Sequence, residues 1–300
     1  MPTTDAIERR LDTAGDLRSI VRTMKALAAV NIRQYEEAAV SIADYARTVE
    51  LGFQALLRVR PGTLDVPAVR SSPPCIGAIV LGSDHGLCGA FNEQVAAFYF
   101  ERRAADQRTE GERLMALGLR AAGRLEDLKQ RPAVVLTLPA SAVRIATLVR
   151  EVLEHVAAWR EAGAVDTVRV YFNAPHGQAG SQPREEQLLP LDGARLRALA
   201  ARPWRPRATP ALAGDWDSLF AAIVRQHLFV TVHRAITLSL ASENASRLAA
   251  MHAAERSIDE RLHSLRGQFN RERQASITTE LLDIVSGYET LAARARPPVR

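Results

Sequence analysis

Hydrophobic residues recur at alternating steps of four and three along the N-terminal part of the chain, where no glycine or proline falls between Gly15 and Gly52. This heptad spacing is typical of one long helix that buries a single stripe against another helix. The predicted stripe comprises Leu17, Val21, Met24, Ala28, Asn31, Tyr35, Ala38, Ile42, Tyr45 and Val49. Its small residues allow a partner helix to approach closely.

The C-terminal part of the chain has the same character, with no glycine or proline between Gly214 and Gly267. Two hydrophobic stripes follow the helical period there, offset from each other by about one residue. The first comprises Leu248, Met251, Ile258, Leu262, Leu265 and Phe269, and the second Ile277, Leu281, Ile284, Tyr288 and Leu291. A single helix of this length is not stable alone in water. We therefore predict that the two terminal helices pair as an antiparallel coiled coil.

The centre of the chain contains most of the prolines and alternates short apolar runs with amphipathic stretches. The pattern predicts strands at 76–82, 113–119, 133–138 and 167–173, and helices at 92–103 and 141–160. Such alternation favours a parallel sheet in a Rossmann-like α/β domain. For two further segments the pattern predicts no regular element: 184–191 is an exposed charged stretch, and 194–214 is a Pro/Arg-rich connection. The resulting domains are 1–60 and 215–300 for the coiled-coil helices and 61–214 for the α/β domain.

Composition excludes several classes of protein. The chain has 300 residues, of which 47% are hydrophobic and 24% charged, and these ordinary globular values exclude whole-chain disorder. No apolar run reaches the roughly 18 residues that a membrane span needs. The first residues contain no apolar signal core, so we expect a protein that is made and kept in the cytoplasm.

The net charge of +5 is spread over the chain, but local counting finds two basic bands. Residues 17–35 contain four basic residues and no acidic one, and residues 261–279 contain four basic residues and one acidic. Two interpretations fit these bands: solvated helix faces, or a basic stalk that faces an acidic partner. A nucleic-acid-binding coiled coil is a further alternative, weakened by the even charge and by acids such as Glu36, Glu37 and Asp259.

A glycine-rich loop lies between the first predicted strand and the helix after it. Its glycines, Gly82, Gly86 and Gly89, do not match the dinucleotide fingerprint, and the loop lacks the lysine of a phosphate-binding loop. We therefore predict a structural turn and no cofactor. His85 and Cys88 could act as base and nucleophile in an α/β-domain enzyme, but no third orienting residue can be named. Two cysteines and the scattered histidines predict no metal site.

Several segments resemble the gamma subunits of F-type ATP synthases. Residues 242–251 (SENASRLAAM), 270–280 (NRERQASITTE) and 284–287 (IVSG) are similar to the C-terminal signature of that family. Residues 82–92 (GSDHGLCGAFN) resemble its central signature, 186–191 (EQLLPL) a segment before the C-terminal helix, and 20–29 the N-terminal helix more loosely. The resemblance covers essentially the whole chain in the right order.

The resemblance implies the architecture already inferred and a function. A gamma subunit is the rotor shaft inside a ring of three alpha and three beta subunits, and its foot joins the epsilon subunit and the c-ring of the membrane sector. It couples transmembrane ion flow to ATP synthesis or hydrolysis and carries no catalytic residue. The family thus implies a peripheral protein on the cytoplasmic face of the bacterial inner membrane, with neither nucleic-acid binding nor membrane insertion.

The resemblance also implies contacts with the beta subunits. The family positions concerned are Arg273, Gln274, Thr278, Glu280, Met24, Lys25 and Arg247. This chain departs from the common pattern where His85 replaces an arginine, Ala90 a glycine and Thr279 a glutamine. These departures indicate a divergent member, with an alternative bacterial F-type complex as one interpretation.

Overall fold

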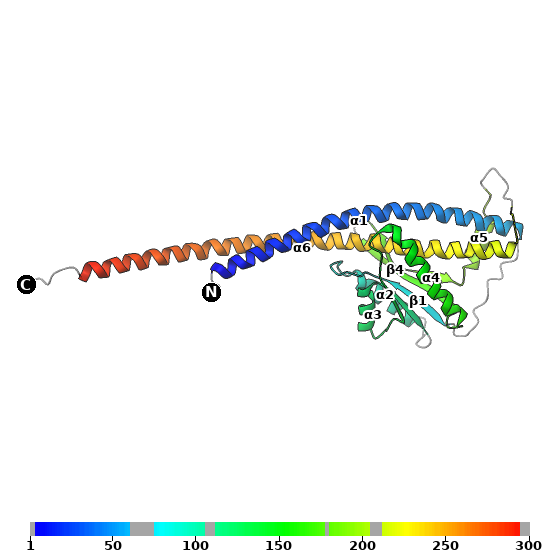
Figure 1. The fold of residues 1–300 in the computed structure, drawn as a ribbon, viewed down its shortest axis with the longest axis horizontal. Coiled ribbons are helices and arrows are strands. Elements are labelled where there is room, and N and C mark those ends of the chain that lie inside the picture. The colour runs from blue at the N-terminus through cyan, green and yellow to red at the C-terminus, as the bar shows by residue number, and fades with distance from the viewer. Residues whose placement is uncertain (1–3, 61–74, 106–111, 178–179, 205–211, 295–300) are drawn as a thin grey trace, which may run out of the picture. The chain divides into compact units, whose positions relative to one another are not determined.

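The computed structural model describes residues 4–60, 75–105, 112–177, 180–204 and 212–294, and only the backbone of 287–294. Contacts divide the chain into two compact units, residues 27–250 and residues 1–26 with 251–300. Two long helices contribute to both units, α1 (Thr4–Val59) and α6 (Trp216–Arg294). Within each unit, α1 and α6 lie side by side (Figure 1). No helix of the described residues is long and apolar enough to span a membrane.

The two helices run in opposite directions, as predicted. In residues 27–250, three hydrogen bonds join them in an order that rises along α1 and falls along α6: Asn31 to Asn244 (3.3 Å), Tyr45 to Gln226 (2.9 Å) and Trp216 to the Leu56 carbonyl (3.1 Å). In the other unit, ion pairs from Arg18 to Asp259 and from Arg22 to Glu255 show the same direction.

In the stripe predicted on α1, every second position is buried. Every seventh residue is buried, namely Val21, Ala28, Tyr35, Ile42 and Val49, while Met24, Asn31 and Ala38 are half-buried. Leu17 and Tyr45 were wrongly predicted, because their exposed fractions are 49% and 42%. The buried face beyond Ile42 turns toward Ala46 and Phe53, which pack against α5 (Gly193–Ala201) and α6. Tyr45 therefore lies at the edge of that face.

The described part of residues 27–250 contains a five-stranded sheet in the order β3-β2-β1-β4-β5. The first four strands of this order are parallel, which agrees with the parallel sheet of the Rossmann-like α/β domain that the central pattern predicted. The last strand is antiparallel, and the pattern predicted neither this strand nor the strand order. The strands are β1 (Ile76–Leu81), β2 (Arg113–Leu117), β3 (Val134–Leu136), β4 (Thr167–His176) and β5 (Gly180–Leu189).

Helices cover both faces of this sheet. One face packs against α2 (Phe91–Ala105) and α3 (Leu119–Asp127), and Val80 and Tyr171 point to that side. The other face packs against α4 (Ile145–Glu161), which follows a short 3-10 turn (Ala142–Arg144), and against α6. Ile79 and Phe172 point there. Alternate residues of each strand thus serve two separate cores, and α6 is part of the second.

The charged stretch at 184–191 was wrongly predicted, because most of it forms β5. Its charges are compatible with an edge strand since they are paired with arginines. Glu185 lies 3.4 Å from Arg102 and 3.2 Å from Arg169, and both carboxylate oxygens of Glu186 accept hydrogen bonds from Arg234 Nη2. Hydrogen bonds to β4 supply the backbone partners.

The sequence reading also missed two short helices. Helix α5 lies in the segment predicted as a connection, and the Asp192 side chain caps it by accepting hydrogen bonds from the Ala194 and Arg195 N–H groups. Residues 205–211 of that segment lie outside the described residues. Helix α3 completes the crossover between β2 and β3.

The two predicted stripes of α6 differ in burial. In the first, Met251, Leu262 and Leu265 are buried. In the second, Ile277, Leu281 and Ile284 are 47%, 58% and 68% exposed, and the side chains of Tyr288 and Leu291 lie outside the description. Pairing of Arg22 with Glu255 sets a register in which α1 begins opposite roughly residue 273. Beyond that point α6 has no partner helix among the described residues.

Candidate functional site on the glycine loop and the paired helices

The glycine loop at 82–89 follows β1, and its first glycine is closely surrounded by other residues. At Gly82 an added Cβ would overlap Ala121 and Asn92, so only glycine fits. Gly89 has a φ of +62°, a left-handed backbone that favours glycine. Gly86 is different, since a Cβ there would meet only the Arg120 side chain, at 4.0 Å.

Polar side chains fix this loop from within. The Ser83 N–H donates to Asn92 Oδ1 (2.9 Å), and Asn92 Nδ2 donates to Ser83 Oγ (2.8 Å). Asp84 accepts hydrogen bonds from the Leu119 N–H (3.0 Å) and the Leu138 N–H (2.7 Å), at the start of α3 and after β3. The loop is therefore a rigid part of the α/β domain.

Cys88 lies inside this loop and does not fit an activated nucleophile. Its side chain is buried, and burial raises the pKa of the thiol. Its sulfur lies 3.6 Å from Ser83 Oγ and 3.5 Å from Asn92 Nδ2, and His85 contributes a backbone carbonyl. These contacts hold a neutral thiol, whereas nucleophilic attack requires the thiolate.

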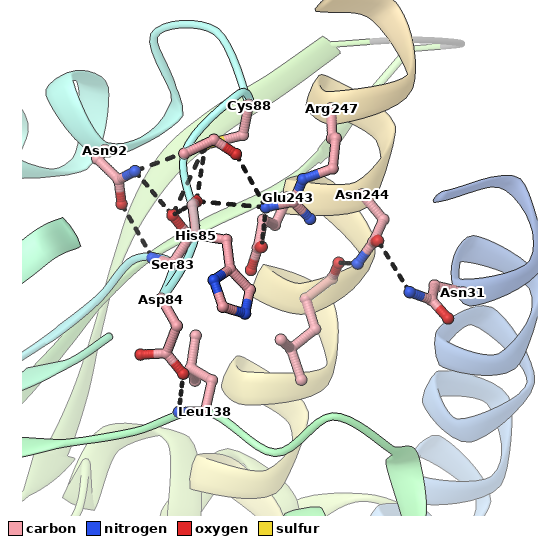
Figure 2. A network of polar contacts seen from close by, with 12 residues as sticks. Asn31, Ser83, Asp84, His85, Cys88, Asn92, Leu138, Glu243, Asn244 and Arg247 are labelled. Carbon is pink, nitrogen blue, oxygen red and sulfur yellow. Dashed lines mark hydrogen bonds and ion pairs between the residues drawn. The ribbon is translucent and has the colours of Figure 1, made fainter. Parts of the chain in front are cut away.

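Helix α6 contacts the loop through a buried ion pair, which Figure 2 shows. Arg247 Nη2 lies 2.6 Å from Glu243 Oε1 and donates weaker hydrogen bonds to the carbonyls of His85 (3.3 Å) and Gly86 (3.4 Å). The side chain of Glu243 is 7% exposed and that of Arg247 is 13% exposed. Burial raises the pKa of Glu243, and Arg247 opposes this shift. Arg247 is thus occupied within the chain.

The same turn of α6 also contacts α1. Asn244 Nδ2 donates to the Leu240 carbonyl (2.8 Å) and Asn244 Oδ1 accepts from Asn31 (3.3 Å). Consecutive residues of α6, Glu243 and Asn244, therefore face the glycine loop and α1 respectively (Figure 2). This turn joins three elements that are far apart in the sequence.

In the other unit, the predicted contact residues of α1 lie along α6. Lys25 Nζ lies 2.6 Å from Glu255 Oε2, Arg22 Nε lies 2.9 Å from Glu255 Oε1, and Met24 is half-buried. The basic band of α1 is therefore largely neutralised by α6, which the single-helix count did not anticipate.

The predicted contact residues near the end of α6 are exposed. Arg273, Gln274, Thr278 and Glu280 all face solvent, and the Thr278 hydroxyl donates to the Gln274 carbonyl. Among the described residues, the arginines of the basic band at 261–279 form no ion pair. Together with the exposed apolar stripe, they leave this segment free to contact a partner.

Comparisons with known proteins agree with this arrangement. A family model described as ATP synthase matches residues 3–291. The ATP synthase gamma chain of Granulibacter bethesdensis is 28% identical, over 97% of this chain and 100% of that protein. The gamma chain of Chlorobium chlorochromatii is 29% identical, over 97% and 99%. The chain belongs to the ATP synthase gamma-subunit family.

Solved structures share the fold of this gamma-family chain. A chain of the Euglena gracilis mitochondrial ATP synthase, in an OSCP/F1/c-ring structure, matches with a TM-score of 0.68 and 18% identity, covering 99% of this chain and 97% of that one. A chain of the central stalk/c-ring structure from Tetrahymena thermophila matches with a TM-score of 0.54 and 18% identity, covering 78% and 99%.

Sequence reasoning missed three features of the site. Gly118 has a φ of +108°, and a Cβ there would lie 2.7 Å from the Ser83 carbonyl oxygen, so a second glycine supports the loop. Glu243 carried no local signal, because its partners on the loop are distant in sequence. The acids Glu255 and Asp259 did carry one: they lie one helical turn apart and face the basic band in an antiparallel register.

Proposed function

We propose that this gamma-family chain is the central rotor shaft of an F-type ATP synthase, turning inside a ring of three alpha and three beta subunits. Rotation couples transmembrane ion flow to ATP synthesis or hydrolysis at the beta subunits. The chain is a non-catalytic subunit in this account. The observation that carries the proposal is the family match over residues 3–291, supported by relatives aligned along almost their whole length.

The arrangement of the helices supports a shaft. Residues 4–26 of α1 pair with α6, while Ile277, Leu281 and Ile284 expose an apolar stripe that no helix of the described chain covers. An exposed apolar stripe of this kind is typical of a surface that another protein covers. Residues 1–60 and 215–300 form the shaft in this proposal, and residues 61–214 form the α/β domain.

The contacts with beta subunits are part of the same proposal. Exposed Arg273 and Gln274 meet a beta-subunit loop, with Thr278 and Glu280 in the same element. From α1, Met24 and Lys25 face the beta subunits. Lys25 and Arg247 reach a beta subunit only by leaving their partners on α6.

The remaining partners follow from the role of a shaft. The foot of the chain binds the epsilon subunit and the c-ring, and the complex lies at the cytoplasmic face of the bacterial inner membrane, with this chain bound peripherally. Neither nucleic acid nor insertion into the membrane is involved.

Purification of the tagged chain from its native cells tests the proposal. We expect alpha and beta subunits to copurify in a ratio of three each to one copy of this chain, and we expect the isolated chain to hydrolyse no ATP. A chain that is monomeric in cells, without alpha and beta, would contradict the proposed function.

A further inference from the structure

Glu255 of α6 binds two cations of α1 at once. Its Oε1 lies 2.9 Å from Arg22 Nε, and its Oε2 lies 2.6 Å from Lys25 Nζ. One turn further along, Asp259 lies 2.7 Å from Arg18 Nε. Two carboxylates thus hold three of the four basic side chains in the band at 17–35.

The carboxylate of Glu255 is ionised and largely shielded from solvent. Hydrogen bonds from Lys25 and Arg22 lower its pKa to about 2, so it is ionised throughout the physiological range. Its side chain is only 16% exposed and that of Lys25 is 28% exposed, while Arg22 is 56% exposed. The Lys25 side chain therefore lies largely along α6, whereas Arg22 stays more than half exposed and is held through its Nε.

Loss of Glu255 would change the surface of the helical pair more than its stability. The side chains of Glu255, Arg22 and Lys25 all remain partly accessible to solvent, and ion pairs that water can reach contribute less to folding than buried apolar contacts. The helices are therefore expected to stay paired through Val21, Met251 and their other buried residues. The two freed cations, however, would become mobile donors on long flexible stems. Such groups form charge-assisted hydrogen bonds with any carboxylate that they meet.

We propose that Glu255 is a positioning residue for rotation: it holds Arg22 and Lys25 against α6 and so limits their binding to carboxylates of the surrounding ring. The inference rests on the proposed function, because only a turning shaft meets several subunits in succession. A cation that binds one orientation tightly lengthens the dwell there and slows every turn.

The test compares assembled complexes that carry wild-type chain, Glu255→Gln, and the matched control Glu260→Gln, which changes an exposed acid of the same helix that forms no described ion pair. The rate of ATP hydrolysis is measured at about 50 mM and about 500 mM salt, a range over which screening weakens exposed charge contacts. We expect Glu255→Gln to lower kcat at least about threefold at low salt, with KM unchanged. The loss should largely disappear at high salt, and Glu260→Gln should match the wild type.

A second background shows whether Glu255 acts through its two cations. In a chain that carries Arg22→Gln and Lys25→Gln, addition of Glu255→Gln should change kcat no further. Glu255→Asp, which keeps the charge on a shorter stem, should cause a smaller loss with the same salt dependence, and it replaces Glu255→Gln if that variant does not assemble.

Two results would overturn the inference: kcat of Glu255→Gln equal to the wild type at low salt, or a loss that persists at high salt and in the doubly substituted background. The second would mean that Glu255 only stabilises the helical pair. Failure of the wild-type chain to assemble with alpha and beta subunits would instead contradict the proposed function, so the two failures are distinguishable.

Discussion

The two basic bands of the helical pair look alike in sequence but differ in structure. In the first band, Arg18, Arg22 and Lys25 of α1 are matched by carboxylates of α6. In the second, the arginines at the end of α6 are exposed and form no ion pair among the described residues, although α1 carries acids in its first turns. Charge counted along one helix therefore does not reveal the charge that the assembled pair presents. The second band remains a cationic surface on the described part of the pair, and we propose that a partner binds it.

The largest effect is expected where a paired arginine is also buried. Replacement of Arg247 by alanine leaves the Glu243 carboxylate without its partner in a site from which water is largely excluded. We expect the free energy of unfolding to fall by about 3–5 kcal/mol, as for other broken buried pairs. Urea unfolding of the full chain, followed by circular dichroism, measures this loss.

The matched control is Arg256→Ala, which removes an exposed arginine of the same helix and should change the free energy by no more than about 0.5 kcal/mol. Addition of Glu243→Gln to the Arg247→Ala chain should recover part of the loss. Equal stability of the Arg247→Ala and Arg256→Ala chains would show that the buried pair does not hold the loop.

The next effect concerns the unmatched band. Replacement of Arg273 and Gln274 by alanine removes two exposed polar side chains that we propose contact beta subunits. We expect ATP-driven ion pumping in membrane vesicles to fall several-fold relative to ATP hydrolysis, or the complex to assemble poorly. The unfolding curve of the isolated chain should stay the same, because neither side chain has a hydrogen-bond or ion-pair partner among the residues that the structure describes. Normal pumping would show that these family contacts do not apply to this chain.

A smaller effect is expected for the contribution of Glu255 to stability, which should depend on pH. The pKa of Glu255 is lowered from 4.5 to about 2 by Lys25 and Arg22. The contribution of a carboxyl group whose folded pKa is depressed is present above its unfolded pKa and is lost as pH falls through the folded value. The difference in thermal midpoint between wild type and Glu255→Gln should therefore be full above pH 4.5 and shrink from there toward pH 2. A difference that does not depend on pH would contradict the ionised pair.

The smallest effect is expected at Asp259, whose pair with Arg18 is 44% and 33% exposed. Asp259→Asn should lower the free energy of unfolding by at most about 1 kcal/mol at low salt. Thermal melts in about 500 mM salt should show no difference from the wild type, since screening removes exposed contacts of this kind. A loss as large as that of Arg247→Ala would erase the distinction between buried and exposed pairs.

Local patterns predicted much of the fold. The heptad of α1 and the apolar run of β1 carry strong periods, so the coiled coil and the parallel sheet could be inferred. Strand β5 could not, because its glutamates are compatible with a sheet only through arginines of other elements. Helix α5 was hidden by its Pro/Arg-rich surroundings, although its cap Asp192 was a usable signal.

The site was less predictable than the fold. Tight turns at Gly82 and Gly89 follow from local sequence, but the contact of Arg247 with the loop joins residues more than 150 positions apart. The contacts of Glu255 with Arg22 and Lys25 depend on the antiparallel register of α1 and α6. The sequence of one helix alone does not determine that register. Met24 and Lys25 were placed by family position alone, and the neutralisation of Lys25 was visible only once α6 lay beside it.

The central claim, that this chain is a rotor, is tested most directly by observation of rotation. The alpha and beta subunits are immobilised, a probe is attached to an engineered cysteine in α3 of this chain, and ATP is added. The account predicts rotation in one direction with three steps per turn, at a rate that follows ATP hydrolysis. Sustained ATP hydrolysis by the complete complex without any turning of the probe would contradict it.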